Sequence, residues 1–349
     1  MKFNKYFSNS YVLEVIILNQ EISQEVNNLK IGVFTAVFGD KTFEDALDSI
    51  KDLGLEAVEI GAGNFAGKQY CNPQNLLENK DELDNFLKKI KKRNLIISAL
   101  NCSGNTLHPD KNYSQSNIKD LKQTVELADR LGVPVVNTFG GCPGADENSN
   151  VPNWITCPWP PYYADAIKWQ WEKKLLPFWE GMAKFAKKHN VKFGFEMHPG
   201  DMIYNPEVLL LLREKIGMEE ISCNFDPSHL FWQGIDPLVA IRQLKDAIVH
   251  IHAKDTRVDN TVVEFRGVLD WKHYSDTLNR AWSFRTIGYG HDLKFWNDFV
   301  SLLKSIGYDY VISIEHEDPL MSPEEGLNKA VNFLKQVVIF KNPGNIWWA

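Results

Sequence analysis

From residue 30 onward, short apolar runs alternate with longer amphipathic segments along the chain. The apolar runs are rich in Val, Ile and Phe, which is typical of strands buried in a parallel sheet. They predict strands at 30–37, 57–62, 96–102, 133–141, 192–197, 221–226, 249–254 and 310–317. The segments between them repeat apolar residues at helical spacing and predict helices at 42–53, 81–93, 118–131, 164–189, 206–216, 237–247, 293–306 and 323–338. Eight strands, each followed by a helix, predict a single (β/α)₈ TIM barrel of the α/β class.

The ends of the helices and the domain limits follow from the same pattern. Glycines stand where four amphipathic stretches end, at Gly54, Gly132, Gly217 and Gly307. A left-handed residue commonly ends a helix there. A doubly wound open sheet is the structural alternative, but no Gly-x-Gly-x-x-Gly motif follows the first strand. No linker or shift in composition divides the chain, so we expect one barrel domain at 30–349 after an N-terminal extension at 1–29.

Composition and charge narrow the classes of function. The 349 residues include 44% hydrophobic and 24% charged residues, as in ordinary globular proteins. With 38 Lys and Arg against 45 Asp and Glu, the formal net charge is −7. This balance argues against a nucleic-acid partner, because such proteins need a basic face. The five cysteines form no Cys-x-x-Cys pair, which favours reduced thiols in a cytoplasmic protein.

The first 29 residues resemble a secretory signal only superficially. Their apolar run is short, Glu14 interrupts it, and no small-residue cleavage site follows. No stretch approaches the roughly 20 apolar residues that span a bilayer. We therefore expect a protein with no membrane partner.

The last four predicted strands end in side chains suited to a metal ion, namely Glu196, Asp226, His252 and Glu315. In a barrel the carboxyl ends of the strands converge on one rim, so residues 30, 26 and 63 positions apart meet around one ion. A lone glutamate at a strand end is more often a solvated rim residue, but a buried carboxylate cluster needs a cation or protons. Three carboxylates and one imidazole suit a divalent metal, Mn²⁺ first, with Mg²⁺ and Co²⁺ as alternatives.

The same site is suited to acid–base chemistry. Two carboxylates beside a metal-bound hydroxy-ketone move a proton between adjacent carbons, with Glu196 and Glu315 as the acid and base. His198 and His229 lie two and three residues beyond predicted ligands. We expect His198 to be catalytic and His229 to bind substrate, with support of the metal ligands as the alternative for both.

Further candidates for substrate binding follow the fourth and seventh strands. Lys254 and Arg257 could bind substrate oxygens or a phosphate, with simple solvation on the rim as the alternative. Insertions are expected at 141–161, after the fourth strand, and at 258–291, after the seventh. The first is rich in proline and aromatic residues, and its Trp154 is predicted to stack on a sugar ring, with packing against the barrel as the alternative.

Taken together, these motifs resemble a known family. Glu196, Asp226-Pro-Ser-His229, His250-x-His252 and Glu315 look like the motifs of the xylose-isomerase-like TIM barrels, the sugar isomerase/epimerase superfamily. The resemblance covers about residues 30–338. It implies that the four predicted ligands bind the divalent metal and that the two glutamates are an acid/base pair. It also implies an isomerase or epimerase that acts on a ketose or oxo-sugar, a small carbohydrate, through an enediolate.

A finer resemblance gives the alternative function. The two insertions and the Glu196-Met-His198 motif are similar to those of the catalytic subunits of bacterial C-glycoside deglycosidases. That similarity implies a carbon–carbon lyase acting on 3-oxo-glycosides with the same metal site and a histidine base. We accordingly expect a homo-oligomer, or a hetero-oligomer with a small partner subunit.

Overall fold

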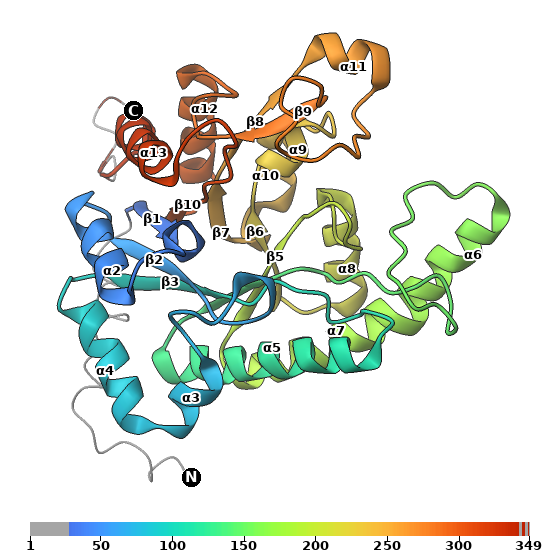
Figure 1. Ribbon diagram of the computed structural model, residues 1–349, viewed down its shortest axis with the longest axis horizontal. Coiled ribbons are helices and arrows are strands. Elements are labelled where there is room, and N and C mark those ends of the chain that lie inside the picture. The colour runs from blue at the N-terminus through green and yellow to red at the C-terminus, as the bar shows by residue number, and fades with distance from the viewer. Residues whose placement is uncertain (1–27, 342–343, 346–347, 349) are drawn as a thin grey trace.

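Eight parallel strands close into a barrel, which confirms the fold predicted from the alternating pattern (Figure 1). The computed structural model describes residues 28–341, 344–345 and 348, so nearly all of the predicted extension at 1–29 lies outside the described residues. Around the barrel the strands follow the order β1-β10-β7-β6-β5-β4-β3-β2, and β1 pairs with β2 to close it. The strands are β1 (Lys30–Phe34), β2 (Ala57–Gly61), β3 (Ile96–Asn101), β4 (Val135–Thr138), β5 (Lys192–Glu196), β6 (Ile221–Phe225), β7 (Ile248–Ala253) and β10 (Val311–Ile314).

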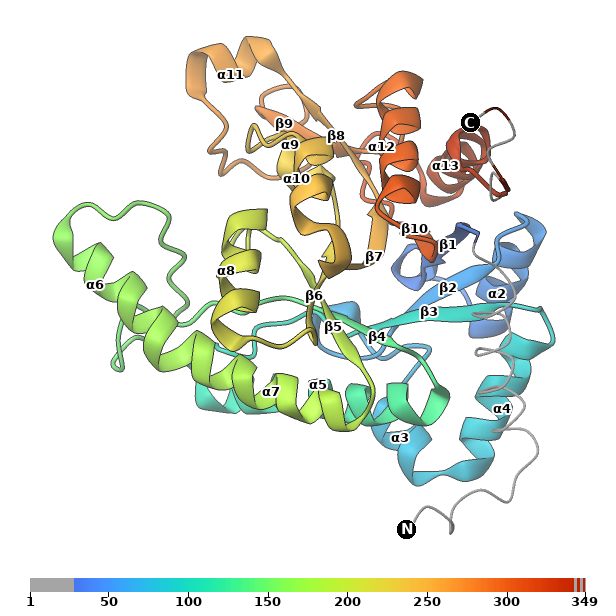
Figure 2. The same cartoon turned by 180° about the vertical axis from the view of Figure 1, so that it is seen from behind.

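Most of the helices lie around the outside of the barrel (Figure 2). They are α2 (Phe43–Asp52), α3 (Pro73–Glu78), α4 (Lys80–Lys91), α5 (Lys111–Leu131), α6 (Pro161–Trp169), α7 (Leu176–Lys188), α8 (Pro206–Ile216), α9 (Ser228–Phe231), α10 (Pro237–Leu244), α12 (Leu293–Ser305) and α13 (Pro323–Val337). The four glycines predicted at helix ends all have a positive φ, between 69° and 84°. In the part of the chain that the structure describes, no helix is both long and apolar enough to cross a membrane.

The helix predicted at 164–189 is interrupted by a π-helical turn. This turn lies between α6 and α7, over Gln170–Leu175. Pro177 gives a physical reason for the change, because it has no N–H to donate to the carbonyl of Lys173, four residues earlier. The apolar spacing is helical on both sides of the turn and therefore does not reveal it.

Side-chain caps explain two other departures from the prediction. Helix α5 begins seven residues before the predicted start, where the carboxylate of Asp110 accepts hydrogen bonds from the amides of Asn112 and Tyr113 at 2.8 and 3.2 Å. The short helix α3, absent from the prediction, is capped in the same way by Asn72. Both starts are polar, so hydrophobic periodicity carries no sign of them.

Both predicted insertions are present. Residues 139–160, after β4, contain no helix or strand. After β7 the chain forms an antiparallel ribbon of β8 (Asp255–Val258) and β9 (Trp282–Arg285), with α11 (Asn260–Arg266) between the two strands. The helices α6 and α11 stand out from the body of the barrel in both views (Figures 1 and 2).

The barrel interior contains a connected layer of polar side chains. These residues are at most 2% exposed and come from β2, β3, β4, β6, β7 and β10: Glu59, Ser98, Asn101, Asn137, Asn224, His250, His252 and Ser313. Buried polar groups are costly unless they are hydrogen-bonded. Each of these side chains therefore needs a hydrogen-bond partner, and these partners determine which residues at the carboxyl end of the barrel the layer holds in place.

Candidate metal site and adjoining cavity

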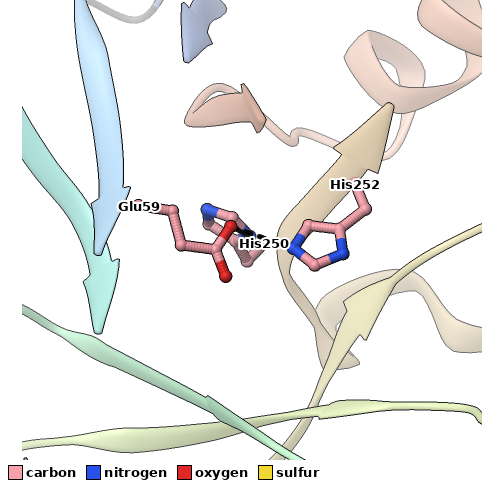
Figure 3. Close-up of side chains that lie close together, drawn as sticks. All are labelled: Glu59, His250 and His252. Carbon is pink, nitrogen blue, oxygen red and sulfur yellow. Dashed lines mark hydrogen bonds and ion pairs between the residues drawn. The ribbon is translucent and has the colours of Figure 1, made fainter. Parts of the chain in front are cut away.

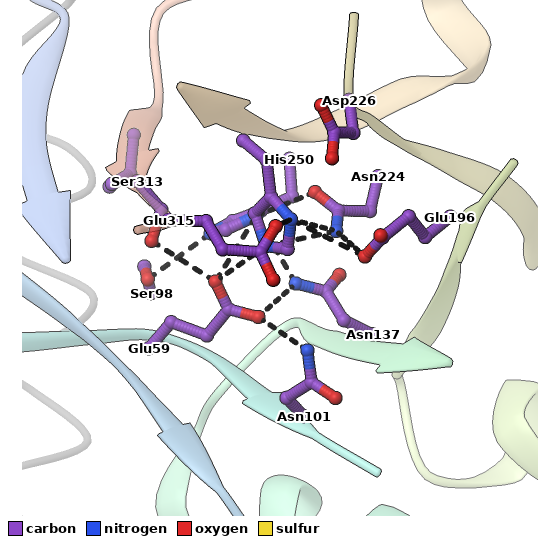
Figure 4. Close-up of polar contacts among 12 residues, drawn as sticks. Glu59, Ser98, Asn101, Asn137, Glu196, Asn224, Asp226, His250, Ser313 and Glu315 are labelled. Atoms are coloured by element: carbon purple, nitrogen blue, oxygen red, sulfur yellow. Dashed lines mark hydrogen bonds and ion pairs between the residues drawn. The ribbon is translucent and has the colours of Figure 1, made fainter. Parts of the chain in front are cut away.

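The four predicted metal ligands meet at the carboxyl end of the barrel, where Figure 4 shows three of them, Glu196, Asp226 and Glu315. Glu196 ends β5, His252 lies in β7, and Asp226 and Glu315 directly follow β6 and β10. Each offers one ligand atom, and these atoms all lie within 4.8 Å of one another. His252 Nδ1 is 3.3 Å from Glu196 Oε2 and 3.0 Å from Glu315 Oε2. The structure thus brings the four residues together, and metal binding by them stays a prediction.

The cluster concentrates negative charge in a buried position. Burial by itself would raise the pKa of Glu196, but the charge of His252 and hydrogen bonds with His229 and His252 hold that pKa well below its usual value. Burial likewise opposes ionisation of Glu315, and the charges of Lys254 and His252 outweigh it and lower the pKa. Both glutamates are therefore ionised near neutral pH and available to a cation.

Asp226 shows whether a cation fits at this position. Its Oδ2 atom is buried and has no hydrogen-bond partner among the described residues. His229 Nε2 and Lys254 Nζ lie 3.3 and 3.2 Å away without hydrogen-bond geometry, and the charge of Lys254 attracts the carboxylate. Leaving a buried polar atom unsatisfied costs about 1–3 kcal/mol, and more for a charged group. A divalent cation held by the four ligand atoms would remove that cost, and the mostly oxygen ligand set suits Mn²⁺, Mg²⁺ or Co²⁺.

Glu59, on β2, binds the other side of the His252 ring (Figure 3). Its Oε2 atom is 2.9 Å from His252 Nε2 and 3.0 Å from the hydroxyl of Ser313. Its Oε1 atom accepts hydrogen bonds from the amide groups of Asn101 and Asn137, each at 2.8 Å. Burial would raise the pKa of Glu59, but the neighbouring histidines and these donors lower it to about 2. A carboxylate that binds one ring nitrogen orients the other nitrogen toward a metal.

His250 belongs to the same motif as His252 but has both ring nitrogens occupied. Its Nδ1 is 3.0 Å from Asn224 Oδ1, and its Nε2 is 3.2 Å from the hydroxyl of Ser98. Burial lowers the pKa of His250 to about 4. Glu59, His250 and His252 also bring ligand-type atoms together, but their hydrogen bonds account for every one of these atoms. We therefore describe this trio as a network that supports the cluster above it.

Sequence reasoning missed Glu59, although the sequence contains a signal for it. The strand Ala57–Gly61 reads Ala-Val-Glu-Ile-Gly, with a single charge in an otherwise apolar run. All five residues are buried. Because a buried carboxylate needs partners, this one position indicates a polar network inside the barrel. Glu317, to which no function was assigned, also belongs to the site, with Oε2 at 2.9 Å from Lys254 Nζ.

His198, the predicted catalytic histidine, lines the cavity beside Glu196. Its Nδ1 is 2.7 Å from the carbonyl oxygen of Pro199, which can only accept, so Nδ1 carries the hydrogen and Nε2 is an acceptor. The ring packs against Phe139 at 4.7 Å and against His229 at 4.5 Å. Burial and the nearby charge of His229 lower the pKa of His198 to about 3. A neutral imidazole in this position is suited to accept a hydrogen bond from a substrate, whereas its low pKa makes it a weak proton acceptor.

His229 supports Glu196 from within the protein. Its Nε2 is 3.1 Å from Glu196 Oε1, and its ring packs edge-on against Phe284 at 5.3 Å. The side chain is fully buried and does not line the cavity. Of the two interpretations raised by the sequence, the geometry favours support of a ligand over direct contact with substrate.

Lys254 lines the cavity and links its carboxylates. Its ammonium group is 2.8 Å from Glu315 Oε2, 2.9 Å from Glu317 Oε2 and 4.6 Å from the centre of the Phe284 ring. Burial would lower the pKa of Lys254, but the charges of Glu315, Glu317 and Asp226 raise it well above its usual value. Lys254 is therefore a fixed positive charge at the predicted position for substrate binding.

The other two predicted substrate-binding residues lie away from the cavity. Arg257 is exposed on β8, where it pairs with Ser283 of β9. Trp154 packs edge-on against Tyr204 at 5.5 Å. Neither residue lines the cavity. The geometry gives no support to substrate binding by Arg257, because β8 belongs to the ribbon and not to the barrel, and it favours packing for Trp154.

A cavity of about 340 Å³ opens beside the cluster and is lined by Phe34, Ala36, Val37, Phe65, Ala66, Asn101, Ser103, Phe139, Glu196, His198, Lys254, Glu315, His316 and Glu317. A larger hollow of about 480 Å³ lies near Pro134, Lys192 and Tyr310, at the opposite end of the strands. Active sites of (β/α)₈ barrels lie at the carboxyl ends of the strands. The cavity beside the cluster is therefore the candidate active site.

Comparison with known proteins identifies the family. A family described as "Xylose isomerase-like TIM barrel" matches residues 47–337. The chain belongs to the xylose isomerase-like TIM barrel family. Within it, the chain is 38% identical to the uncharacterized protein YfiH of Bacillus subtilis (strain 168) over 314 residues, which is 89% of this chain and 99% of that protein.

More distant matches extend along nearly the whole chain. The chain is 22% identical to an inosose dehydratase of Mesomycoplasma hyopneumoniae (strain J) over 325 residues, covering 90% of this chain and 98% of that protein. It also matches the crystal structure of the IOLI protein with a zinc atom, at 17% identity and a TM-score of 0.60. That match covers 88% of this chain and 97% of the other, and it supports the fold.

Proposed function

We propose that the protein is a divalent-metal-dependent sugar isomerase or epimerase that acts on a ketose or oxo-sugar through an enediolate. The observation that carries this proposal is the placement of Glu196 and Glu315. Both carboxylates border the cavity and lie 3.3 and 3.0 Å from the same nitrogen, His252 Nδ1. Similarity to an inosose dehydratase and to a zinc-containing barrel adds support for sugar chemistry at a metal.

The proposed metal ligands are Glu196, Asp226, His252 and Glu315, with Mn²⁺ as the first choice and Mg²⁺ or Co²⁺ as alternatives. A divalent ion in this position supplies a Lewis acid, which polarises a carbonyl group and stabilises negative charge that develops beside it. Glu59 takes part indirectly, because its hydrogen bond to Nε2 leaves Nδ1 of His252 directed toward the other ligands.

The two glutamates hold and move the proton. One carboxylate removes a proton from the carbon next to the carbonyl group. Return of a proton to the neighbouring carbon completes an isomerisation, and return to the opposite face of the same carbon completes an epimerisation. Lys254 orients Glu315 and His229 orients Glu196 through the contacts at 2.8 and 3.1 Å. His198 offers Nε2 as the acceptor for a substrate hydroxyl.

Elimination is a second candidate that begins with the same proton abstraction. Similarity to an inosose dehydratase favours it, since loss of water follows when a hydroxyl leaves from the next carbon and takes up a proton. In the C-glycoside deglycosidase alternative, the carbon–carbon bond of a 3-oxo-glycoside breaks instead, and the aglycone carbon takes up the proton. A small partner subunit belongs to that second proposal.

Solvent deuterium exchange tests the proposed function. Protein loaded with Mn²⁺ is incubated in D₂O with ketoses, 3-oxo-glycosides and C-glycosides, and products are analysed by NMR and mass spectrometry. We expect deuterium at the carbon next to the carbonyl. Epimerisation leaves the carbon skeleton intact, dehydration removes water, and deglycosylation releases an aglycone.

Charge-neutral variants test the assigned acid and base. We expect Glu196→Gln and Glu315→Gln each to slow exchange by about 10²–10⁴-fold, the usual contribution of a general acid or base. Glu264→Gln, on the exposed face of α11, is the matched control. Full turnover by both active-site variants, with metal bound, would show that the proton-transfer mechanism is wrong.

A further inference from the structure

We infer that the substrate of this cavity is an uncharged cyclic sugar or polyol ketone, without a phosphate or carboxylate group. This inference rests on the proposed function and narrows its substrate. It depends on the charge of one wall of the cavity, the composition of the other wall, and the volume between them.

One wall of the cavity is strongly negative, because Glu196, Glu315 and Glu317 lie on it. Lys254 is the only lysine or arginine among the described residues that line the cavity. Its ammonium group already lies within 3.2 Å of carboxylate oxygens of Glu315, Glu317 and Asp226. The side chain is only 1% exposed, so a phosphate would have to displace these carboxylates to reach it.

A bound divalent ion does not reverse the charge of this wall. The three carboxylate ligands and Glu317 together carry four negative charges. Lys254 and a divalent ion together carry three positive charges, so one negative charge remains. Proteins bind phosphate with arginine forks, lysines or the free amides of helix N-termini. At this rim, the amide of Phe65 already donates to the carbonyl of Ser103 at 2.8 Å. An anionic substrate would therefore lose hydration without gaining matching partners.

The other wall is apolar and aromatic. It contains Phe34, Phe65 and Phe139, which lie at or just beyond the ends of β1, β2 and β4. Phe65 is 64% exposed and lines the cavity, so its ring is accessible to a ligand there. Aromatic faces pack well against the C–H faces of sugar rings. Ser103, also in the lining, has a buried hydroxyl without a partner in the described part of the chain, and a substrate hydroxyl would satisfy it.

The volume of the cavity limits the substrate to a small molecule. Its 340 Å³ lies near the lower end of the range of about 300–1,000 Å³ typical of small-molecule sites. A single hydroxylated ring suits both walls, because its C–H face can pack on the phenylalanines while its hydroxyl groups meet the carboxylates and Ser103. The substrate must also contain a ketone, which is uncharged, because the proposed reaction removes a proton from the carbon next to a carbonyl group.

Matched neutral and anionic compounds test the inference. Protein loaded with Mn²⁺ is given D-fructose or D-fructose 6-phosphate, and D-tagatose or D-tagatose 6-phosphate. Binding is followed by saturation-transfer NMR and reaction by deuterium exchange. In each pair we expect kcat/KM for the neutral compound to be at least about 100-fold higher, because like charges in contact strongly disfavour a complex. An equal or higher kcat/KM for the anionic compound would overturn the inference.

The two measurements separate this inference from the proposed function. If the neutral compounds bind and the anionic compounds do not, but no compound exchanges deuterium, the proposed function fails and the substrate class stands. If no neutral compound binds, the inference about the substrate fails. If an anionic compound exchanges preferentially, the proposed function stands and only the substrate class is wrong.

A change of charge at the rim tests the electrostatic reason directly. Phe65→Arg places a cation beside the cavity, and we expect it to shift the ratio of kcat/KM toward D-fructose 6-phosphate by at least about 10-fold. Phe265→Arg adds the same charge on α11, where Phe265 is 84% exposed, and should leave the ratio unchanged. A ratio that does not move in Phe65→Arg would contradict the role of charge in selecting the substrate.

Discussion

His252 connects the polar interior of the barrel to the candidate metal site through its two ring nitrogens. Nε2 is 2.9 Å from Glu59, and Nδ1 faces Glu196 and Glu315 at 3.3 and 3.0 Å. Because Glu59 engages one nitrogen, it fixes the orientation of the ring and presents the other nitrogen to the candidate metal site. Glu59 is thus a positioning residue, since it lies beneath the cluster and does not line the cavity.

Replacing Glu59 tests this positioning. We expect Glu59→Gln to weaken binding of Mn²⁺ or Co²⁺ by about 10- to 100-fold, because an amide neither balances the ring charge nor fixes the ring as strongly. Isothermal titration of metal-free protein measures the affinity, and the ¹⁵N shifts of His252 report which ring nitrogen carries hydrogen. Glu264→Gln is the control, and thermal unfolding of the metal-free variant separates lost affinity from misfolding. An unchanged metal affinity in a folded Glu59→Gln protein contradicts the assignment.

The clustering of the four proposed ligands could be predicted from the sequence, whereas the residues that support them could not. Acidic and imidazole residues at four strand ends predict a shared centre once a barrel is assumed, because the topology brings those ends together. The partner of His252 is 193 residues away, on a different strand, and periodicity does not pair a particular glutamate with a particular histidine. His229 illustrates the same limit, since its sequence position does not tell whether it faces the cavity or Glu196.

At the scale of elements, apolar runs predict the barrel strands well because all eight strands are buried between the helices and the interior. Apolar runs do not predict the ribbon of β8 and β9. Its strands, Asp-Thr-Arg-Val and Trp-Ser-Phe-Arg, contain no continuous apolar run and are defined by pairing with each other. Capping residues and Pro177 likewise determine where helices begin and change their hydrogen bonding, independently of hydrophobic spacing.

The π-helical turn between α6 and α7 also forms hydrogen bonds to the insertion that follows β4. Gln170, in this turn, donates hydrogen bonds from Nε2 to the carbonyl oxygens of Asn153 and Gly144 at 2.7 and 3.1 Å. The side chain is fully buried. The π-helical turn therefore places the side-chain amide of Gln170 between two irregular parts of the insertion, at Gly144 and Asn153.

Removing this anchor should loosen the insertion without opening the barrel. We expect Gln170→Leu to destabilise the protein by about 1–3 kcal/mol, the cost of leaving buried carbonyl groups without a donor. Chymotrypsin should then cut more rapidly after Tyr162, which is already exposed. Limited proteolysis with mass spectrometry locates the cuts, and Gln336→Leu on the exposed face of α13 is the control. Equal cleavage rates in the two variants would rule out an anchoring role for Gln170.

At the scale of the whole molecule, one buried carboxyl group links stability to pH. Asp201 is 9% exposed, and burial, together with the charge of Glu196, raises its pKa to about 7. In the folded protein this group is neutral at pH values where an ordinary carboxyl group is ionised. Its contribution to stability is therefore fully present below about pH 4 and is lost as the pH rises to about 7.

Asp201→Asn should remove this dependence, because an amide does not ionise. The free energy of unfolding of the variant, relative to the natural protein, should rise by about 1.4 kcal/mol per pH unit between about pH 4 and pH 7, and stay constant above. Urea unfolding of metal-free protein at a series of pH values measures this difference. Asp52→Asn, at an exposed position, is the matched control. A difference independent of pH would show that Asp201 ionises normally.

The order of strands around the barrel separates two tasks. The proposed ligands come from β5, β6, β7 and β10, which are consecutive neighbours, whereas the aromatic wall of the cavity comes from β1, β2 and β4, on the remaining arc. The wall can therefore vary at exposed positions such as Phe65 without replacement of a proposed ligand, whereas Glu59 on β2 supports His252 and couples the two arcs. Descendants of such a barrel can acquire new substrates by mutation of one side while they inherit an unchanged reaction centre on the other.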